Sequence, residues 1–318
     1  MSPGLALYVR RISKARHGTP RELARRCAGA GLGWVALGAV WQDLDETGRP
    51  TTKRINDADT IATYAAALEA EGVGVYVWGY PWQGCEEQFV AGMVEADGGR
   101  GRVLLDPELG ANPDRASRGA GKAKANSHAT ALVTQLATAL PSDAVLGLSS
   151  FGAGWRLQWF PLLAFTRAMV DRFGGRCFVG GQTYTDDGFI DTSMAEFSTA
   201  IEKAGGVISA PNGDKPSGRG VALVPNFGTY TWESPSGQRG KRAKGARAKP
   251  KTAAELKAHL DEFIHEGSPV ESLIGWAENF MTEPLWEELA RFSATMKRGR
   301  EGRGNEPKAR GDTATPAS

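Results

Sequence analysis

The sequence contains few cysteines and histidines, and each shortage argues against a class of functional site. The three cysteines, Cys27, Cys85 and Cys177, are widely spaced and form no CxxC motif. This spacing disfavours both a disulfide framework and a cysteine-based zinc site. The four histidines fall in predicted helices and loops away from strand ends. A Ser–His–Asp hydrolase and a histidine-rich metal centre are therefore disfavoured, and we expect no metal.

Long apolar runs and nucleotide-binding motifs are missing as well. No signal-peptide core and no run of about 18 apolar residues occurs, so neither an export signal nor a membrane span is indicated. We expect synthesis in the cytoplasm, with release by lysis or carriage in a virion if the protein acts outside a cell. No GxGxxG opens a helix after a strand and no GxxxxGK[ST] is present, so no cofactor is expected. The net charge of +2 disfavours general nucleic-acid binding.

The sequence does contain short apolar runs that alternate with amphipathic segments. Eight such runs predict strands at 5–9, 33–41, 73–80, 102–108, 144–152, 177–184, 220–227 and 272–280, and a helix is predicted after each. Thr19, Pro20 and Glu22 form a capping box at the start of the first helix. A doubly wound sheet of eight strands would show the same alternation. Count and length favour an α/β fold with a single (β/α)8 TIM barrel over 1–297, followed by a disordered tail over 298–318.

In such a barrel the active site is built from the carboxyl ends of the strands and the loops that follow them. The residues at these positions are acidic, aromatic or amide-bearing, which suits a carbohydrate, because sugars stack on aromatic rings and their hydroxyls bond to carboxylates and amides. The candidate substrate-binding residues are Trp41, Trp78, Tyr80, Trp82, Gln182, Tyr184, Asp187, Asn226 and Trp276.

Two carboxylates in the fourth predicted strand are the best candidates for chemistry. Asp106 and Glu108 are two residues apart, so on a strand both side chains point to the same side. Neighbouring carboxylates raise each other's proton affinity, and one can stay protonated while the other is ionised. Glycoside hydrolysis requires that division. Glu278 in the eighth strand is a third catalytic candidate, because barrel glycosidases place carboxylates on several strand ends.

The stretch from Cys27 to Gly110 resembles the first half of glycoside hydrolase family 25, the phage and bacterial muramidases. The similar segments are CAGAGLGWVALGAVW, AEGVGVYVWGY and EEQFVAGMVEADGGRGRVLLDPE, the last ending in Asp-x-Glu. The resemblance implies that Glu108 is the general acid, that Asp106 is its partner and that Tyr80 lies beside them. It also implies a peptidoglycan substrate. The aspartate that these muramidases carry at the end of strand one is missing, because this chain reads LALYVRR there.

Three interpretations remain open at this stage. The first is a barrel that hydrolyses cell-wall glycan, and the second is a noncatalytic barrel that serves as a binding or structural component, for example of a phage-like particle. The third is a metal-dependent hydrolase, which the missing histidines disfavour. A separate feature is the segment from Arg239 to Lys251 after the seventh strand, with seven Lys or Arg and no acid. A disordered, solvated insertion is the default interpretation, contact with an anionic polymer is the alternative, and the lack of aromatics disfavours nucleic acid.

Overall fold

The apolar runs form parallel strands, and each run is followed by a helix. The computed structural model describes residues 4–14, 18–151, 158–183, 190–208, 219–233, 239–240, 247–263, 272–276 and 280–304. In chain order the barrel strands are β1 (Gly4–Val9), β2 (Trp34–Leu44), β4 (Gly74–Tyr80), β5 (Arg102–Leu105), β6 (Val145–Phe151), β7 (Cys177–Thr183), β9 (Gly220–Leu223) with β10 (Asn226–Gly228), and β14 (Ser272–Trp276).

Parallel pairing runs round the whole ring and closes it. The order is β14–β1–β2–β4–β5–β6–β7, and β7 pairs with both β9 and β10 before β10 returns to β14. The predicted seventh strand is thus two short strands separated by Val224 and Pro225, as expected because proline has no N–H to donate. The short strand β8 (Val207–Ile208) pairs with β9 outside the ring. The barrel prediction is confirmed.

Alternation along the strands divides the core into two parts. On β1, β2 and β4 the odd-numbered residues, such as Leu7, Val35 and Val77, pack against the helices. The even-numbered residues form a second cluster, which fills the inside of the barrel and consists of Ala6, Tyr8, Trp34, Ala36, Tyr76, Trp78, Leu104, Phe178, Val224 and Ile274. The barrel is therefore packed with side chains, and a site can only be built on its carboxyl end.

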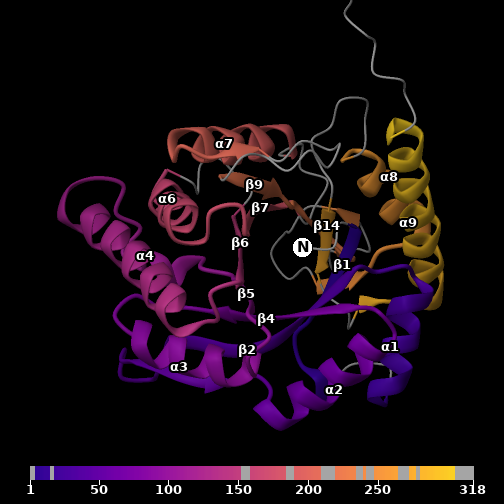
Figure 1. The fold of residues 1–318 in the computed structure, drawn as a ribbon, viewed down its shortest axis with the longest axis horizontal. Helices are drawn as coiled ribbons and strands as arrows, with labels where there is room; N and C mark the ends of the chain where they lie inside the picture. Colours follow the sequence, from indigo (N-terminus) through magenta and orange to yellow (C-terminus); the bar gives the residue numbers. More distant parts are fainter. Residues whose placement is uncertain are drawn as a thin grey trace, which may run out of the picture.

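The helices surround the strands (Figure 1). They are α1 (Pro20–Gly29), α2 (Ala58–Ala70), α3 (Glu86–Asp97), α4 (Gly119–Ala139), α6 (Leu162–Phe173), α7 (Ile190–Lys203), α8 (Ala253–Asp261) and α9 (Glu283–Gly304). The predicted capping box of α1 is present, with the Thr19 side chain accepting from the Glu22 N–H and Glu22 accepting from the Thr19 N–H. Helix α9 continues to Gly304, so the first part of the expected tail is helical, and residues 305–318 lie outside the described residues.

Two segments that the sequence presented as loops contain strands. The polar stretch after residue 41 is a hairpin, in which β3 (Pro50–Arg54) pairs antiparallel with the extended end of β2. The basic segment contributes β12 (Arg239–Gly240) and β13 (Arg247–Pro250), which flank β11 (Tyr230–Glu233) in a small antiparallel sheet. Lys251, just beyond β13, is buried. Part of the segment is therefore ordered rather than a solvated insertion, and residues 241–246 lie outside the described residues.

Candidate active site

A polar layer closes the carboxyl end of the barrel above the inner apolar cluster. The Gln182 amide on β7 donates to Asp106 Oδ1 at 2.6 Å and to Ser149 Oγ at 3.4 Å. The Asn226 amide on β10 donates to the same Ser149 hydroxyl at 2.6 Å. Asp106, Ser149 and Asn226 are buried, whereas Gln182 is partly exposed. These four side chains join β5, β6, β7 and β10 in one hydrogen-bonded chain.

The acidic pair lies just beyond β5 rather than within it. Strand β5 ends at Leu105, and Pro107 cannot extend the ladder because it has no N–H. Glu108 has φ −87° and ψ −114°, so the alternation rule for strands no longer decides where its side chain points. Asp106 is only 3 % exposed, whereas Glu108 is partly exposed. The structure therefore gives the two carboxyl groups unequal access to solvent.

The proton of this pair is favoured on Asp106. Burial raises the pKa of Asp106 well above its usual range, and the negative charge of Glu108 raises it further. The hydrogen bond from Gln182 and the positive charge of Arg10 lower the same pKa but do not outweigh burial. A neutral buried carboxyl group beside one that reaches the surface is an arrangement suited to proton transfer at the rim.

Three aromatic rings lie around the polar layer. Tyr8 contacts Trp276 edge-on, with centroids 4.9 Å apart, and Trp78 at 5.5 Å, while Trp78 and Trp276 are 5.4 Å apart. Burial raises the pKa of Tyr8 well above its usual range, so its hydroxyl stays protonated. Tyr8 and Trp78 are fully buried, and Trp276 is partly exposed. Trp276 can therefore contact a sugar. Trp78 was expected to bind sugar as well, but it packs inside the barrel.

Trp41 and Tyr80 form a second aromatic group, which includes a cation that sequence reasoning did not select. Their rings stack with centroids 4.3 Å apart and planes 19° apart. The Arg10 guanidinium lies over the Trp41 ring, 4.6 Å from its centroid. The faces of Trp41 are thus already in contact with protein groups. Tyr80 is buried, and its hydroxyl accepts from the Gly110 N–H at 3.2 Å. Burial and the charge of Glu108 raise the pKa of Tyr80.

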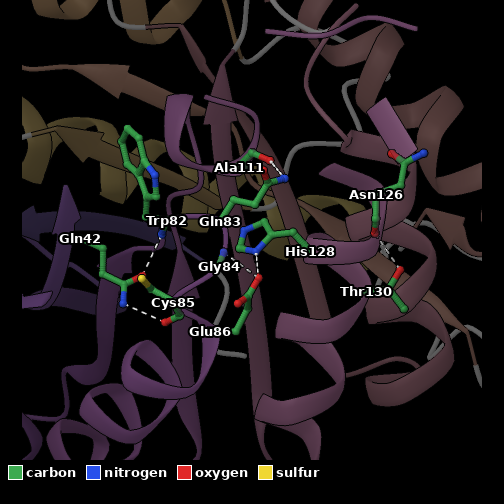
Figure 2. A network of polar contacts seen from close by, with 10 residues as sticks. All are labelled: Gln42, Trp82, Gln83, Gly84, Cys85, Glu86, Ala111, Asn126, His128 and Thr130. Carbon is green, nitrogen blue, oxygen red and sulfur yellow. Dashed lines mark hydrogen bonds and ion pairs between the residues drawn. The ribbon is translucent and has the colours of Figure 1, made fainter. Parts of the chain in front are cut away.

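The loop that carries Trp82 is fixed by buried hydrogen bonds (Figure 2). The fully buried Gln42 accepts from the Trp82 N–H at 2.8 Å and donates to the Cys85 carbonyl at 2.9 Å and to Thr52 Oγ1 at 2.8 Å. The Gln83 N–H donates to the Gly110 carbonyl at 2.8 Å, which ties this loop to the one that holds Glu108. Trp82 itself is partly exposed. It is therefore held at a defined place on the rim.

The same loop is anchored to α4 by a contact between Glu86 and His128. Glu86 Oε1 lies 2.5 Å from Nδ1 of the buried His128 on α4, and it also accepts from the Gly84 N–H. Burial alone would raise the pKa of Glu86, but the hydrogen bonds from His128 and the backbone outweigh it and lower the pKa to about 2. This histidine supports the loop from outside the barrel, as its predicted place in a helix implied.

Not every predicted site residue falls within the described structure. Of the nine predicted substrate-binding residues, Trp41, Trp82, Gln182 and Trp276 are partly exposed, and Asn226 is buried in the polar layer. Glu278, Tyr184 and Asp187 lie outside the described residues. Sequence reasoning missed Tyr8, Ser149 as a hydrogen-bonding hub, and Arg10. The inward alternation of Ala6 and Tyr8 was the available signal for Tyr8.

The described part of the chain has a groove outside the barrel but no cluster of metal ligands. Within this part of the chain, no group of three or more His, Cys, Asp or Glu side chains is arranged to hold a metal ion. None of its helices is long and apolar enough to cross a membrane. A groove of about 950 Å³ lies outside the barrel between α4, α6 and α7, lined by residues such as Lys122, Phe160 and Glu196. It contains none of the predicted site residues.

Comparison with known proteins supports the fold. No family model and no curated protein sequence matches the chain. A glycoside hydrolase family 18 N-acetylglucosaminidase from Paenibacillus barengoltzii aligns with 91 % of this chain and 99 % of its own, at 12 % identity and TM-score 0.54. The Bacillus cereus spore cortex-lytic enzyme SleL aligns over 90 % and 73 %, at 12 % identity and TM-score 0.51. A xylanase and α-amylase inhibitor protein from Scadoxus multiflorus aligns over 94 % and 99 %, at 10 % identity and TM-score 0.51. The chain thus has the barrel fold of these proteins, and at such identities the likeness concerns the fold alone.

Proposed function

We propose that this chain is a glycoside hydrolase that cleaves a cell-wall glycan, peptidoglycan, by general acid catalysis. The proposal depends on the carboxyl pair after β5, in which Asp106 is buried and keeps its proton while Glu108 reaches the surface. Glycoside hydrolysis needs a carboxyl group that can deliver a proton to the leaving oxygen. The motif resemblance to family 25 muramidases and the barrel shared with a spore cortex-lytic enzyme support the choice of substrate.

Glu108 is the general acid in this proposal, because it is the member of the pair that a substrate can reach. Because Glu108 is the ionised member of the pair at rest, it must first take up a proton from solvent, which leaves both carboxyl groups neutral. When Glu108 then gives this proton to the glycosidic oxygen, it returns to its charged form, and that charge favours the neutral form of Asp106. No second negative charge then lies beside the new carboxylate. Asp106 thereby stabilises the product of proton transfer, and Gln182 holds it in place through Oδ1.

Substrate contacts in this proposal come from the partly exposed side chains of the rim. Trp276 and Trp82 offer aromatic surface, and Gln182 has an amide that can reach sugar hydroxyls. Trp276 ends β14 and Trp82 follows β4, so the two aromatics stand at separate places on the rim. The carboxyl pair follows β5, next to β4 in the ring. In this proposal a glycan chain lies across the carboxyl end of the barrel between these groups.

A noncatalytic glycan-binding barrel is the second candidate, and the burial of Asp106 favours it. At 3 % exposure, Asp106 cannot touch a sugar directly, so only Glu108 of the pair is available to one. The fold itself is compatible with either outcome, because it is shared with a protein described as an inhibitor of xylanase and α-amylase as well as with enzymes. The two candidates differ in whether the glycan is cleaved after it binds.

The decisive experiment measures clearing of a peptidoglycan suspension by the wild type, by Glu108→Gln and by Glu46→Gln as a control. Glu46 is exposed on the β2–β3 hairpin, so its substitution removes a charge away from the pair. We expect clearing by the wild type and by Glu46→Gln, and a loss of roughly a hundredfold or more with Glu108→Gln, since a general acid contributes that much. A pull-down with the same peptidoglycan measures binding separately.

Each outcome decides between the two candidates. Equal clearing by the wild type and Glu108→Gln would remove Glu108 from the mechanism. Binding without clearing by the wild type would favour the noncatalytic barrel, and absence of both would reject peptidoglycan as the ligand.

A further inference from the structure

Arg10 is a cation held over an aromatic ring at the edge of the candidate active site. It follows β1 directly, and its guanidinium lies 4.6 Å from the centroid of Trp41, which stacks on Tyr80. Its positive charge acts on the buried carboxyl group of Asp106 and lowers that pKa. Arg10 thus lies within electrostatic reach of the acidic pair while remaining exposed to solvent.

The backbone that carries Arg10 is fixed from below. The Asn56 side chain donates to the carbonyls of Arg10 at 3.0 Å and of Gly38 at 2.7 Å, and it accepts from the Ile12 N–H at 3.0 Å. A Cβ atom at Gly38 would lie 2.4 Å from the Arg10 carbonyl oxygen, so this close approach depends on glycine. The backbone of Arg10 is therefore held in place, and the contact with the Trp41 ring favours one position of the guanidinium.

Arg10 has two basic neighbours in addition to the buried carboxyl group of Asp106. Arg11 is the next residue, and Lys53 on β3 is directly opposite Trp41, so its side chain lies on the same face of the hairpin. Asp43 lies on this face too, farther along the hairpin, and its Oδ1 accepts from the Leu44 N–H. Within the part of the chain that the structure describes, the Arg10 side chain forms no hydrogen bond to a carboxylate. Its planar fork of donors is therefore available to a ligand, and that fork matches a carboxylate.

We propose that Arg10, oriented by Trp41, binds a carboxylate carried by a sugar, so that the ligand of this barrel is an acidic glycan rather than a neutral one. This inference rests on the proposed function, because it assigns a substrate class to the same rim. Trp41 has the role of holding the guanidinium, since its faces contact Tyr80 and Arg10. A sugar whose carboxylate meets Arg10 lies near the Trp41–Tyr80 pair, and the Tyr80 hydroxyl accepts from the Gly110 N–H in the loop that holds Glu108.

The test compares binding of two tetrasaccharides by calorimetry. One alternates N-acetylglucosamine with N-acetylmuramic acid that has a free lactyl carboxylate, and the other is the neutral N-acetylglucosamine tetramer. All proteins carry Glu108→Gln so that nothing is cleaved. We expect the acidic tetrasaccharide to bind roughly tenfold more tightly than the neutral one, and this preference to shrink as salt rises from about 0.05 to about 0.5 M.

Substitutions then assign the preference to Arg10. Arg10→Gln should bind the acidic tetrasaccharide roughly tenfold more weakly and leave the neutral one unchanged. Arg10→Lys, which keeps the charge but loses the planar fork, should bind the acidic tetrasaccharide with an affinity between those of Arg10 and Arg10→Gln. Arg11→Gln, which removes the neighbouring exposed charge, should keep most of the preference. Melting temperatures of all variants should match, since Arg10 is exposed.

Several results would overturn the inference. These are equal affinity for the two saccharides, equal weakening of both by Arg10→Gln, or no detectable binding of either. The outcome is separate from that of the proposed function. A protein that prefers the acidic tetrasaccharide but cleaves no glycan would retain the inference and reject the hydrolase.

Discussion

The Gln182 amide donates to Asp106 Oδ1 at 2.6 Å, across the end of β6. Because this donor occupies Oδ1, the proton of the neutral Asp106 carboxyl group belongs on Oδ2. The register supports this geometry, since Gln182 on β7 is paired with Asn226 on β10, and both amides reach Ser149. One hydrogen bond thus fixes both the orientation of the Asp106 carboxyl group and the oxygen that carries its proton.

Replacing Asp106 with asparagine should make the protein more stable at neutral pH. The native pKa of Asp106 is raised, so the native state holds a proton that the unfolded chain has lost. The wild type therefore loses stability as pH rises from about 4 through the native pKa. An asparagine side chain has no such proton to lose, and its oxygen can still accept from Gln182. Urea denaturation at several pH values should show the advantage of Asp106→Asn growing with pH and vanishing near pH 4.

Asp114→Asn is the matched control for that measurement, because Asp114 is exposed. It should leave the pH profile of the wild type unchanged. If Asp106→Asn destabilises the protein equally at every pH, then Asp106 is ionised in the native state.

Replacing Gln42 with leucine should loosen the loop that carries Trp82. The fully buried Gln42 side chain forms three hydrogen bonds, and leucine would leave the Trp82 N–H and the Cys85 carbonyl without this partner. Groups left unsatisfied cost about 1–3 kcal/mol each. We expect a loss of stability of that order and faster amide hydrogen exchange over residues 82–86. Gln88→Leu, at an exposed position on α3, should change neither quantity. Unchanged exchange in Gln42→Leu would show that Gln42 does not fix the loop.

Replacing Glu86 with glutamine should remove a pH-dependent contribution to stability. The pKa of Glu86 is lowered from about 4.5 to about 2, so its ionised form stabilises the native state above about pH 4.5 and this contribution is lost as pH falls towards 2. Glu86→Gln should be less stable than the wild type by about 1–3 kcal/mol at pH 7, because His128 loses a charged partner. Guanidinium denaturation should show the two proteins converging near pH 2. Glu87→Gln, at the neighbouring exposed position, should have the same stability as the wild type at each pH. A stability difference between Glu86→Gln and the wild type that stays constant at all pH values would contradict the lowered pKa of Glu86.

Replacing Gly110 with alanine should displace the loop that holds Glu108. A Cβ atom at residue 110 would lie 2.2 Å from the Pro81 carbonyl oxygen and 3.1 Å from the Tyr80 ring. Relieving this clash should cost about 1–3 kcal/mol of unfolding free energy. The rate of glycan hydrolysis should fall by more than the loss of stability explains, since Glu108 moves with the loop. Gly29→Ala, at the end of α1 with open space around it, should cost nothing. Full activity in Gly110→Ala would show that the loop position does not matter.

Several elements of the fold could be predicted from local sequence. Thr19, Pro20 and Glu22 predict the start of α1, because their side chains satisfy backbone groups a few residues away. The helix predicted after the fifth strand is present as α6. By contrast, the β2–β3 hairpin has a mostly polar sequence, and its strand β3 is mostly exposed, so hydrophobic periodicity gave no sign of it.

The candidate site could be predicted only in outline. Asp106, Gln182, Asn226 and Trp276 were selected because the ends of parallel strands meet at one end of a barrel. Which of them a ligand can reach was not predictable, because Trp78 and Trp276 look alike in sequence while only Trp276 is partly exposed. Arg10 was missed for a similar reason. Its role depends on Trp41, which lies 31 residues away in sequence and meets it only through the pairing of β1 with β2.

The sequence by itself determined the alternation of strands and helices, the inward and outward faces of each strand, and the gathering of acids, amides and aromatics at one end. These properties follow from contacts over a few residues and from the period of a strand. Only the tertiary structure decided that Asp106 is buried and neutral while Glu108 is accessible, and that a cation lies on Trp41 beside them. The burial of a carboxyl group and the charges around it depend on residues brought together from distant strands. Together they decide which carboxyl group of the pair keeps the proton.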